Sequence, residues 1–182
     1  REREALHNQV AEKAVMYWKR AREAHRRHAY LVRKRVSGEG VRQQGDLLLV
    51  PMGDAAGKLW NIQFITPDGE KRFMKGGRTS GLFWMAGNPC AEVAIGEGFA
   101  TMAAIRRATG IAVVATFSAA NLEPVAQIIR KAWPDTKITI AADDDAHLLD
   151  HPTIKRNLGL EAAKAAAAAV GDRVCHRRQL RG

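Results

Sequence analysis

The C-terminal half of the chain alternates short apolar runs with longer segments in which apolar residues recur every three or four positions. Short runs rich in Val and Ile are typical of buried strands, whereas the longer period is typical of helices that pack on one face. The expected elements alternate strand and helix, at residues 92–96, 99–109, 111–115, 122–133, 137–142, 157–170 and 173–175. Strands that alternate with helices form a parallel sheet with helices on both faces, so we predict an α/β fold for this half.

The N-terminal half follows a different pattern. Apolar residues at helical spacing from Leu6 to Ala24 predict an amphipathic helix from residue 2 to about residue 27. Three short strands are expected next, at residues 46–50, 58–65 and 70–75, the first closed by Pro51 and the last two joined as an antiparallel hairpin. We therefore divide the chain into a basic helical segment (1–36), a small β-rich basic subdomain (37–88) and the α/β domain (89–182).

Acidic residues follow two of the predicted buried strands. Glu97 comes directly after residues 92–96, and Asp143, Asp144 and Asp145 come directly after residues 137–142. The carboxyl ends of parallel strands meet at one edge of the sheet, where ligands of α/β folds bind. Like charges placed close together repel unless a cation lies between them, and Mg²⁺ prefers such oxygen ligands.

We therefore predict a metal site formed by Glu97, Asp143 and Asp145, since Asp143 and Asp145 lie two positions apart and project to one side. The alternative is that these acids are solvated turn residues or helix N-caps. Asp144 projects the opposite way in an extended segment, and it fits either interpretation.

A basic strand precedes the α/β half. Lys71 and Arg72 lie in it, Lys75 ends it, and Gly76-Gly77-Arg78 follows. One interpretation is that the glycines let the backbone approach a phosphate that Lys75 and Arg78 neutralise. The other is that the glycines form a turn and the cations form a solvated edge that prevents strand-to-strand association.

Four motifs in series resemble a known family. The motifs are Glu97-Gly98-Phe99-Ala100-Thr101, Phe117-Ser118-Ala119-Ala120-Asn121-Leu122, Ala142-Asp143-Asp144-Asp145 and Asn157-Leu158-Gly159. Together they are similar to the Toprim-domain DNA primases of conjugative plasmids and phages, over about residues 28 to 172. The resemblance implies a Toprim fold, catalytic and metal-binding roles for Glu97, Asp143 and Asp145, and Mg²⁺ or Mn²⁺ as cofactor. It also implies that Lys75 and Arg78 belong to a basic ridge that holds nucleotide or template, and we count Lys71 and Arg72 of the same strand among the candidate nucleotide- or DNA-binding residues.

The resemblance leaves two features open. It implies a role near the site for Asn121, although helix capping alone would explain that residue. Gly159 follows Asp145 by fourteen residues, a longer separation than in bacterial replicative primases. The insertion at residues 146–156 carries Lys155, which we count among the candidate nucleotide- or DNA-binding residues.

Charge is distributed unevenly along the chain. The net charge is +10, and residues 1–80 hold 17 Lys and Arg against 9 Asp and Glu, a net of +8. A basic surface of this kind attracts polyanions and would lie beside the acidic edge, although a solvated basic surface without a partner is the alternative.

The remaining composition indicates the setting. Two cysteines are too few for a disulfide framework, and no apolar run approaches the length of a membrane span, so we expect a reducing, cytoplasmic protein without a membrane partner. The chain begins with Arg1 and its first helix has no cap, which indicates a piece of a longer protein with additional domains.

The leading functional hypothesis is a Mg²⁺-dependent primase core. It would join ribonucleoside triphosphates into short RNA primers on a single-stranded DNA template, in plasmid conjugation or phage and mobile-element replication. The alternatives are a Toprim nuclease that uses the same acids, and a non-catalytic DNA-binding module of a relaxase-type conjugation protein.

Overall fold

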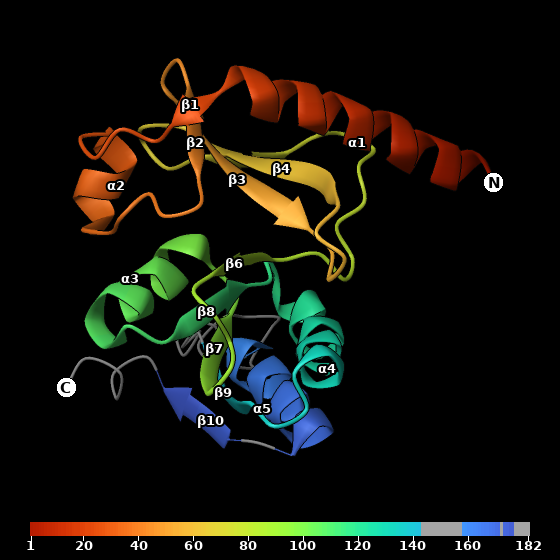
Figure 1. Cartoon of the computed structure of the whole chain (residues 1–182), viewed down its shortest axis with the longest axis vertical. Coiled ribbons are helices and arrows are strands. Elements are labelled where there is room, and N and C mark those ends of the chain that lie inside the picture. Colours follow the sequence, from red (N-terminus) through yellow and green to blue (C-terminus); the bar gives the residue numbers. More distant parts are fainter. Residues whose placement is uncertain (143–157, 172, 177–182) are drawn as a thin grey trace, which may run out of the picture.

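The computed structural model describes residues 1–142, 158–171 and 173–176, and it contains two sheets that lie one above the other in Figure 1. The elements in chain order are α1 (Glu2–Arg20), β1 (Arg22–Glu23), α2 (Ala29–Lys34), β2 (Arg42–Gln44), β3 (Leu47–Gly53), β4 (Leu59–Ile65), β5 (Lys71–Phe73), β6 (Trp84–Ala86), β7 (Glu92–Gly96), α3 (Phe99–Thr109), β8 (Ala112–Ala115), the 3₁₀ turn η1 (Ala119–Asn121), α4 (Leu122–Ala132), β9 (Lys137–Ala142), α5 (Leu158–Val170) and β10 (Arg173–His176). The expected α/β fold with an antiparallel part before it is confirmed.

The C-terminal sheet has the strand order β10-β9-β7-β8-β6. Strands β7 to β10 pair in parallel, and β6 pairs antiparallel with β8 at one edge. Alternate residues of β7 face opposite sides: Val93 and Ile95 pack with α4 and α5, whereas Ala94 packs in a cluster with α3. The sheet is therefore covered on both faces, which accounts for the continuous apolar runs in its strands.

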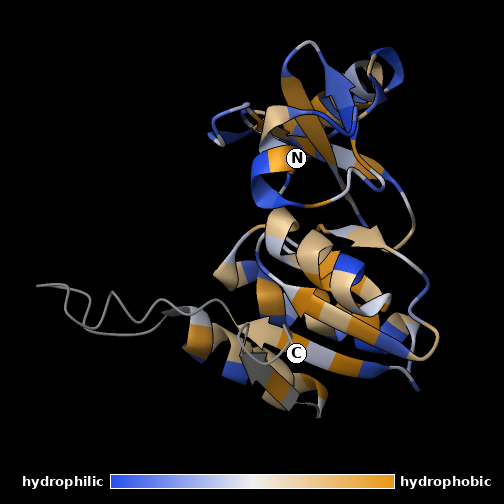
Figure 2. Cartoon of the chain, turned by 90° about the vertical axis from the view of Figure 1, so that its left-hand side faces the viewer, coloured by the Kyte–Doolittle hydropathy of each residue, from blue (hydrophilic) through white to orange (hydrophobic). Residues whose placement is uncertain are grey.

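The N-terminal sheet is antiparallel throughout, in the order β1-β2-β3-β4-β5. Helix α1 covers one of its faces through a cluster that contains Ala14, Leu49 and Ile62. In Figure 2 the strands of the C-terminal sheet are largely apolar, while hydrophilic residues gather on strands and loops of the N-terminal part.

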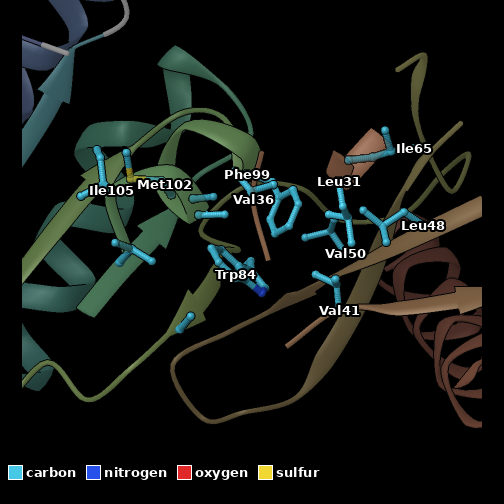
Figure 3. Packing of buried hydrophobic residues seen from close by; sticks show 14 of the residues in the cluster. Leu31, Val36, Val41, Leu48, Val50, Ile65, Trp84, Phe99, Met102 and Ile105 are labelled. Atoms are coloured by element: carbon cyan, nitrogen blue, oxygen red, sulfur yellow. The ribbon is translucent and has the colours of Figure 1, made fainter. Parts of the chain in front are cut away.

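One apolar cluster joins the two parts of the molecule. Figure 3 shows side chains of the N-terminal part packed against those of β6 and α3: Leu31, Val36, Val41, Leu48, Val50 and Ile65 on one side, and Trp84, Phe99, Met102 and Ile105 on the other. The rings of Trp84 and Phe99 meet edge to face, with centroids 4.9 Å apart. This shared core holds the basic part in a defined position over the C-terminal sheet, while the domain boundaries at residues 36 and 88 stay predictions.

The first helix is shorter than its apolar spacing predicts. Helix α1 ends at Arg20, and Ala21 is extended with φ −78° and ψ 144°. Two tertiary contacts account for this end: β1 pairs with β2, and the Arg42 guanidinium donates to the carbonyl oxygen of Trp18 at 2.6 Å. Ala21 and Ala24 remain in apolar contacts, so their spacing reflects burial and not a continuing helix.

The expectation that Pro51 closes its strand is wrong. Strand β3 continues to Gly53, and Pro51 pairs with Ile62 of β4. The N–H of Gly53 points toward Phe83, so the nitrogen of Pro51, two residues earlier, faces the same side. Strand β2 pairs only with Leu47–Leu49 on that side, and the missing N–H therefore costs no ladder hydrogen bond.

No helix among the described residues is both long enough and apolar enough to cross a membrane.

Candidate functional site

Glu97 lies in the turn between β7 and α3, as the sequence predicts. Its neighbours have structural roles: Gly98 is the N-cap of α3, and Gly96 sits where the chain is tightly packed. A Cβ at Gly96 would lie 2.6 Å from Met102 Cε and 3.1 Å from the carbonyl oxygen of Ala141. Only glycine therefore lets β7 approach β9 and α3 this closely just before the acid.

The ends of β7 and β9 are adjacent, which is the arrangement that the metal prediction requires. The two strands pair in parallel, with Ile95 opposite Ile140, and β9 ends at Ala142. The predicted ligands Asp143, Asp144 and Asp145 follow directly in sequence, but they lie outside the described residues, as does Lys155. Within the described ranges, no group of three or more His, Cys, Asp or Glu residues could hold a metal.

The end of β8 lies on the other side of β7. The N–H of Thr116 donates to the carbonyl oxygen of Gly96 at 2.9 Å, and the N–H of Phe117 donates to that of Glu97 at 2.8 Å. Phe117 has φ +69°, a left-handed conformation that is rare for a bulky residue. The backbone after β8 is therefore bent sharply beside the acid.

A cleft of about 340 Å³ opens next to this bend. Its lining combines the end of β5, the segment before β6 and the segment after β8: Phe73, Thr79, Ser80, Thr116, Phe117, Ser118, Ala120 and Asn121. The rings of Phe73 and Phe117 meet edge to face with centroids 6.2 Å apart. Since the N-terminal sheet supplies Phe73 and the C-terminal sheet supplies Phe117, the cleft exists only where the two parts meet.

Asn121 forms the buried base of the cleft and does not cap a helix with its side chain. Its Oδ1 accepts from the N–H of Gly81 at 2.8 Å, and its Nδ2 donates to the carbonyl oxygens of Leu82 at 2.8 Å and Thr116 at 2.9 Å, with a longer contact to that of Thr79 at 3.4 Å. The side chain thus ties the segment before β6 to the end of β8, so its capacity for hydrogen bonds is used within the protein.

The basic loop that follows β5 is anchored by Asn61. The Asn61 side chain accepts from the N–H of Met74 at 3.1 Å and donates to the carbonyl oxygen of Arg78 at 2.9 Å. A Cβ at Gly77 would lie 2.4 Å from Asn61 Nδ2, and Gly76 has φ +76°. Packing against Asn61 and α1 therefore accounts for the glycine pair.

The two main basic candidates differ in their surroundings. Lys75 is exposed, and it makes no hydrogen bond or ion pair with any described residue. Arg78 is held: its Nε donates to the carbonyl oxygen of Ser80 at 2.9 Å, and its guanidinium lies 5.0 Å from the ring centroid of Trp60. Because Ser80 lines the cleft, Arg78 places a positive charge at the rim of the cleft.

Asp54 supports this arrangement from the other end of Trp60. The Trp60 Nε1–H donates to Asp54 Oδ2 at 2.7 Å. Burial raises the pKa of Asp54, but hydrogen bonds from Trp60 and from the N–H groups of Lys58 and Ala56, together with the charge of Arg78, outweigh burial and leave this pKa below its usual value. The Trp60 ring, against which the Arg78 guanidinium lies, is therefore held in place by the ionised carboxylate of Asp54.

The candidates on β5 lie on opposite faces. Lys71 pairs with Ile65 and Phe73 with Gln63, so their side chains share a face, whereas Arg72 pairs with Phe64 and points to the other face. Arg72 also forms a 2.7 Å ion pair with Glu70. Lys71 is thus the better placed of the two to reach a ligand beside Phe73.

Sequence reasoning missed the aromatic residues of the cleft. Phe73 lies within a basic strand, and a single aromatic residue there was a usable signal. The conformation of Phe117 and its proximity to Phe73 had no local signal, because both depend on how the two parts pack.

The C-terminal part of the chain matches a known family. Residues 92–178 match the family model of the Toprim domain. Two proteins named DNA primase TraC from Escherichia coli are similar to the chain over 134 residues, 71% of its length, at 42% and 41% identity. The chain covers only 9% and 12% of these two relatives.

A solved structure shows a related fold. The primase fragment of the bacteriophage T7 primase-helicase protein superposes with a TM-score of 0.58 at 13% identity, over 82% of this chain and 64% of that one. The fold likeness includes the N-terminal part, since the matched share is far larger than the Toprim segment alone.

Proposed function

We propose that the chain, whose residues 92–178 match the family model of the Toprim domain, is the catalytic core of a DNA primase that makes short RNA primers on single-stranded DNA during plasmid conjugation or mobile-element replication. The observation that carries this proposal is the identity of 42% to DNA primase TraC over 134 residues, more than the Toprim segment contains. The similarity therefore extends into the basic part that would hold the template.

The donor set at the sheet edge fits a divalent cation. Glu97 follows β7, and Asp143 and Asp145 come directly after β9 in sequence, so the proposed ligands follow two strands that pair in parallel. Oxygen ligands of this kind suit Mg²⁺ or Mn²⁺, and Asp144 is a further candidate ligand. A cation bound there supplies charge stabilisation for the triphosphate and for the attacking 3′-hydroxyl.

The basic residues take complementary roles. Lys75 and Arg78 bind phosphates of the template or of the incoming ribonucleoside triphosphate, and Arg78 does so at the rim of the cleft. Lys71, which shares a face of β5 with Phe73, and Lys155 are further candidates for phosphate binding, whereas Arg72 lies on the opposite face and pairs with Glu70. Asn121 acts indirectly, because its side chain holds the cleft in shape.

The chain functions within a longer protein. Its small share of the TraC relatives supports this, because those proteins are several times its length. Additional domains would supply initiation-site recognition and delivery of DNA, and the setting is the cytoplasm, where template and nucleotides are available.

The test is incubation of the chain with single-stranded DNA, Mg²⁺ and labelled ribonucleotides, with the Glu97→Gln variant in parallel. New labelled oligonucleotides from the wild type alone support a primase. Shortened DNA without new oligonucleotides indicates a Toprim nuclease. DNA retention without either product indicates a non-catalytic binding module and overturns the proposal.

A further inference from the structure

We infer that the cleft lined by Phe73 and Phe117 is a nucleobase-binding pocket that holds a base by stacking on the exposed ring of Phe73. This inference deepens the proposed function, and it rests on that function only for the origin of the base. The ligand class itself follows from the chemistry of the cleft.

The lining of the cleft favours a base over a phosphate. All eight lining residues are uncharged, and two aromatic rings form its apolar walls. A phosphate would require a cation or a cluster of N–H donors inside the cleft. Flat aromatic surfaces, in contrast, stack on the face of any nucleobase.

Phe73 is placed as a binding residue and not as a core residue. Its side chain is 41% exposed on a strand otherwise made of Lys71 and Arg72, and it is absent from the apolar clusters of both sheets. An aromatic ring that stays exposed to water beside a cleft gains apolar burial when a ligand covers it.

Phe117 adds a second observation. Its φ of +69° is unfavourable for a bulky side chain, and such conformations occur where the surrounding structure holds a residue for function. The hydrogen bonds of Thr116 and Phe117 to the carbonyl oxygens of Gly96 and Glu97 hold the strained backbone. The ring is thereby directed to Phe73, next to the acid that the proposed function assigns to the metal.

The surroundings of the cleft fit the rest of a nucleotide. Arg78 donates to Ser80 of the cleft lining, and the carbonyl oxygen of Glu97 accepts from the N–H of Phe117, so a base in the cleft would lie close to both a cation and the proposed metal ligand. The Asn121 amide is engaged with backbone groups. Stacking on an aromatic ring is available to every base, so this part of the interaction carries little base preference.

The base could belong to the DNA template or to a ribonucleotide, and two experimental arms separate these sources. The first compares binding of an oligodeoxynucleotide with binding of the same strand carrying abasic sites. The second compares binding of ATP with that of inorganic tripolyphosphate. In each arm, only the first probe carries a base.

The Phe73→Ala variant should weaken binding of one base-bearing probe, the intact oligodeoxynucleotide if the base comes from the template or ATP if it comes from a ribonucleotide. The expected loss is roughly 5- to 150-fold, which corresponds to the removal of one stacking interaction. Binding of the abasic strand and of tripolyphosphate should be unchanged. Phe73→Trp should restore tighter binding of the base-bearing probe than of its base-free counterpart. Phe73→Leu, which keeps apolar bulk and secures folding, should not restore it. Tyr17→Ala is the matched control, because Tyr17 is 44% exposed and also forms an edge-to-face pair, with Phe64 on the far face of the sheet.

Base-dependent binding that Phe73→Ala and Phe73→Leu leave intact would overturn the inference, as would a wild-type chain that binds both probes of each arm equally. Primer synthesis is measured separately. If the chain makes primers but its binding does not depend on a base, only the pocket inference is refuted. If binding depends on a base but no primers are made, only the proposed primase function is refuted.

Discussion

The backbone N–H of Phe117 donates a 2.8 Å hydrogen bond to the carbonyl oxygen of Glu97, although the two residues are twenty positions apart. This bond joins the turn after β7 to the strained turn after β8. The predicted metal ligand and the aromatic cleft therefore share one rigid backbone connection. Changes that remove charge from Glu97 and changes that alter the cleft should consequently be separable, because the connection is made by backbone atoms.

Glu97→Gln should reduce primer synthesis to background while leaving the free energy of unfolding within about 0.5 kcal/mol of wild type. The substitution keeps the shape of the side chain and removes only its charge. Glu92→Gln is the matched control, since Glu92 begins the same strand and pairs with Lys137 at its other end. Primer yield and urea denaturation provide the measurements. Wild-type synthesis by Glu97→Gln would remove Glu97 from the mechanism.

Lys75→Ala and Arg78→Ala should each weaken binding of single-stranded DNA and lower the salt slope of the affinity by roughly 0.7 for each phosphate that is no longer neutralised. Arg72→Ala is the control, because Arg72 is paired with Glu70 and lies on the opposite face of β5. Affinities are measured at several salt concentrations. Unchanged slopes for Lys75→Ala and Arg78→Ala would place the nucleic-acid surface elsewhere, with the basic helix α1 as the next candidate.

Asp143→Asn and Asp145→Asn should eliminate synthesis without weakening DNA binding. Removing a negative charge near phosphates leaves affinity unchanged or raises it slightly, because repulsion falls. Titration of the wild type and both variants with Mn²⁺ provides a second measurement, in which the variants should bind the metal more weakly. Equal Mn²⁺ affinity in all three proteins would exclude these residues as ligands.

Asn121→Ala should destabilise the chain by about 2–4 kcal/mol. The side chain is buried, and its removal leaves the N–H of Gly81 and the carbonyl oxygens of Leu82 and Thr116 without their partner. Asn88→Ala, at an exposed position, should change stability by less than about 0.5 kcal/mol. Denaturant unfolding measures both variants, and equal stabilities would show that the hydrogen bonds of Asn121 contribute little.

Arg35→Gly should stabilise the chain by roughly 0.5–1 kcal/mol. Arg35 ends α2 with φ +55°, a left-handed conformation that costs a residue with a Cβ more than it costs glycine. Lys34→Gly is the opposite control, since Lys34 is helical and glycine there should cost about 1 kcal/mol. The two variants should therefore shift the denaturation midpoint in opposite directions, and a shift in the same direction would show that the backbone conformation of Arg35 carries no such cost.

The C-terminal half was predictable because its signals are local. Helix α3 spans Phe99–Thr109 as its period predicts, and Gly110 ends it with φ +73°. Strand β9 likewise spans Lys137–Ala142 as predicted. Apolar period, caps and glycine conformations depend on neighbouring residues, so they can be inferred from the sequence without knowledge of the packing.

Elements set by distant partners were not predictable in this way. Strand β6 forms because Trp84–Ala86 pairs with β8 at the edge of the C-terminal sheet. Helix α1 ends where β1 pairs with β2 and where the Arg42 side chain donates to the carbonyl oxygen of Trp18. The hydrogen bonds that decide these elements are made with residues about twenty or more positions away. No local window contains both partners.

The sequence by itself determined the alternation of strands and helices, the placement of Glu97 after β7 and the basic excess of the first 80 residues, because each follows from residue type and period along the chain. Tertiary structure alone decided that Asn121 bridges two segments and does not cap a helix, and that Phe73 meets Phe117 across 44 residues. The physical reason is that a cleft between two packed parts depends on the shared apolar core that orients them. That core brings together side chains that are far apart in sequence, so their proximity cannot be inferred from the sequence alone.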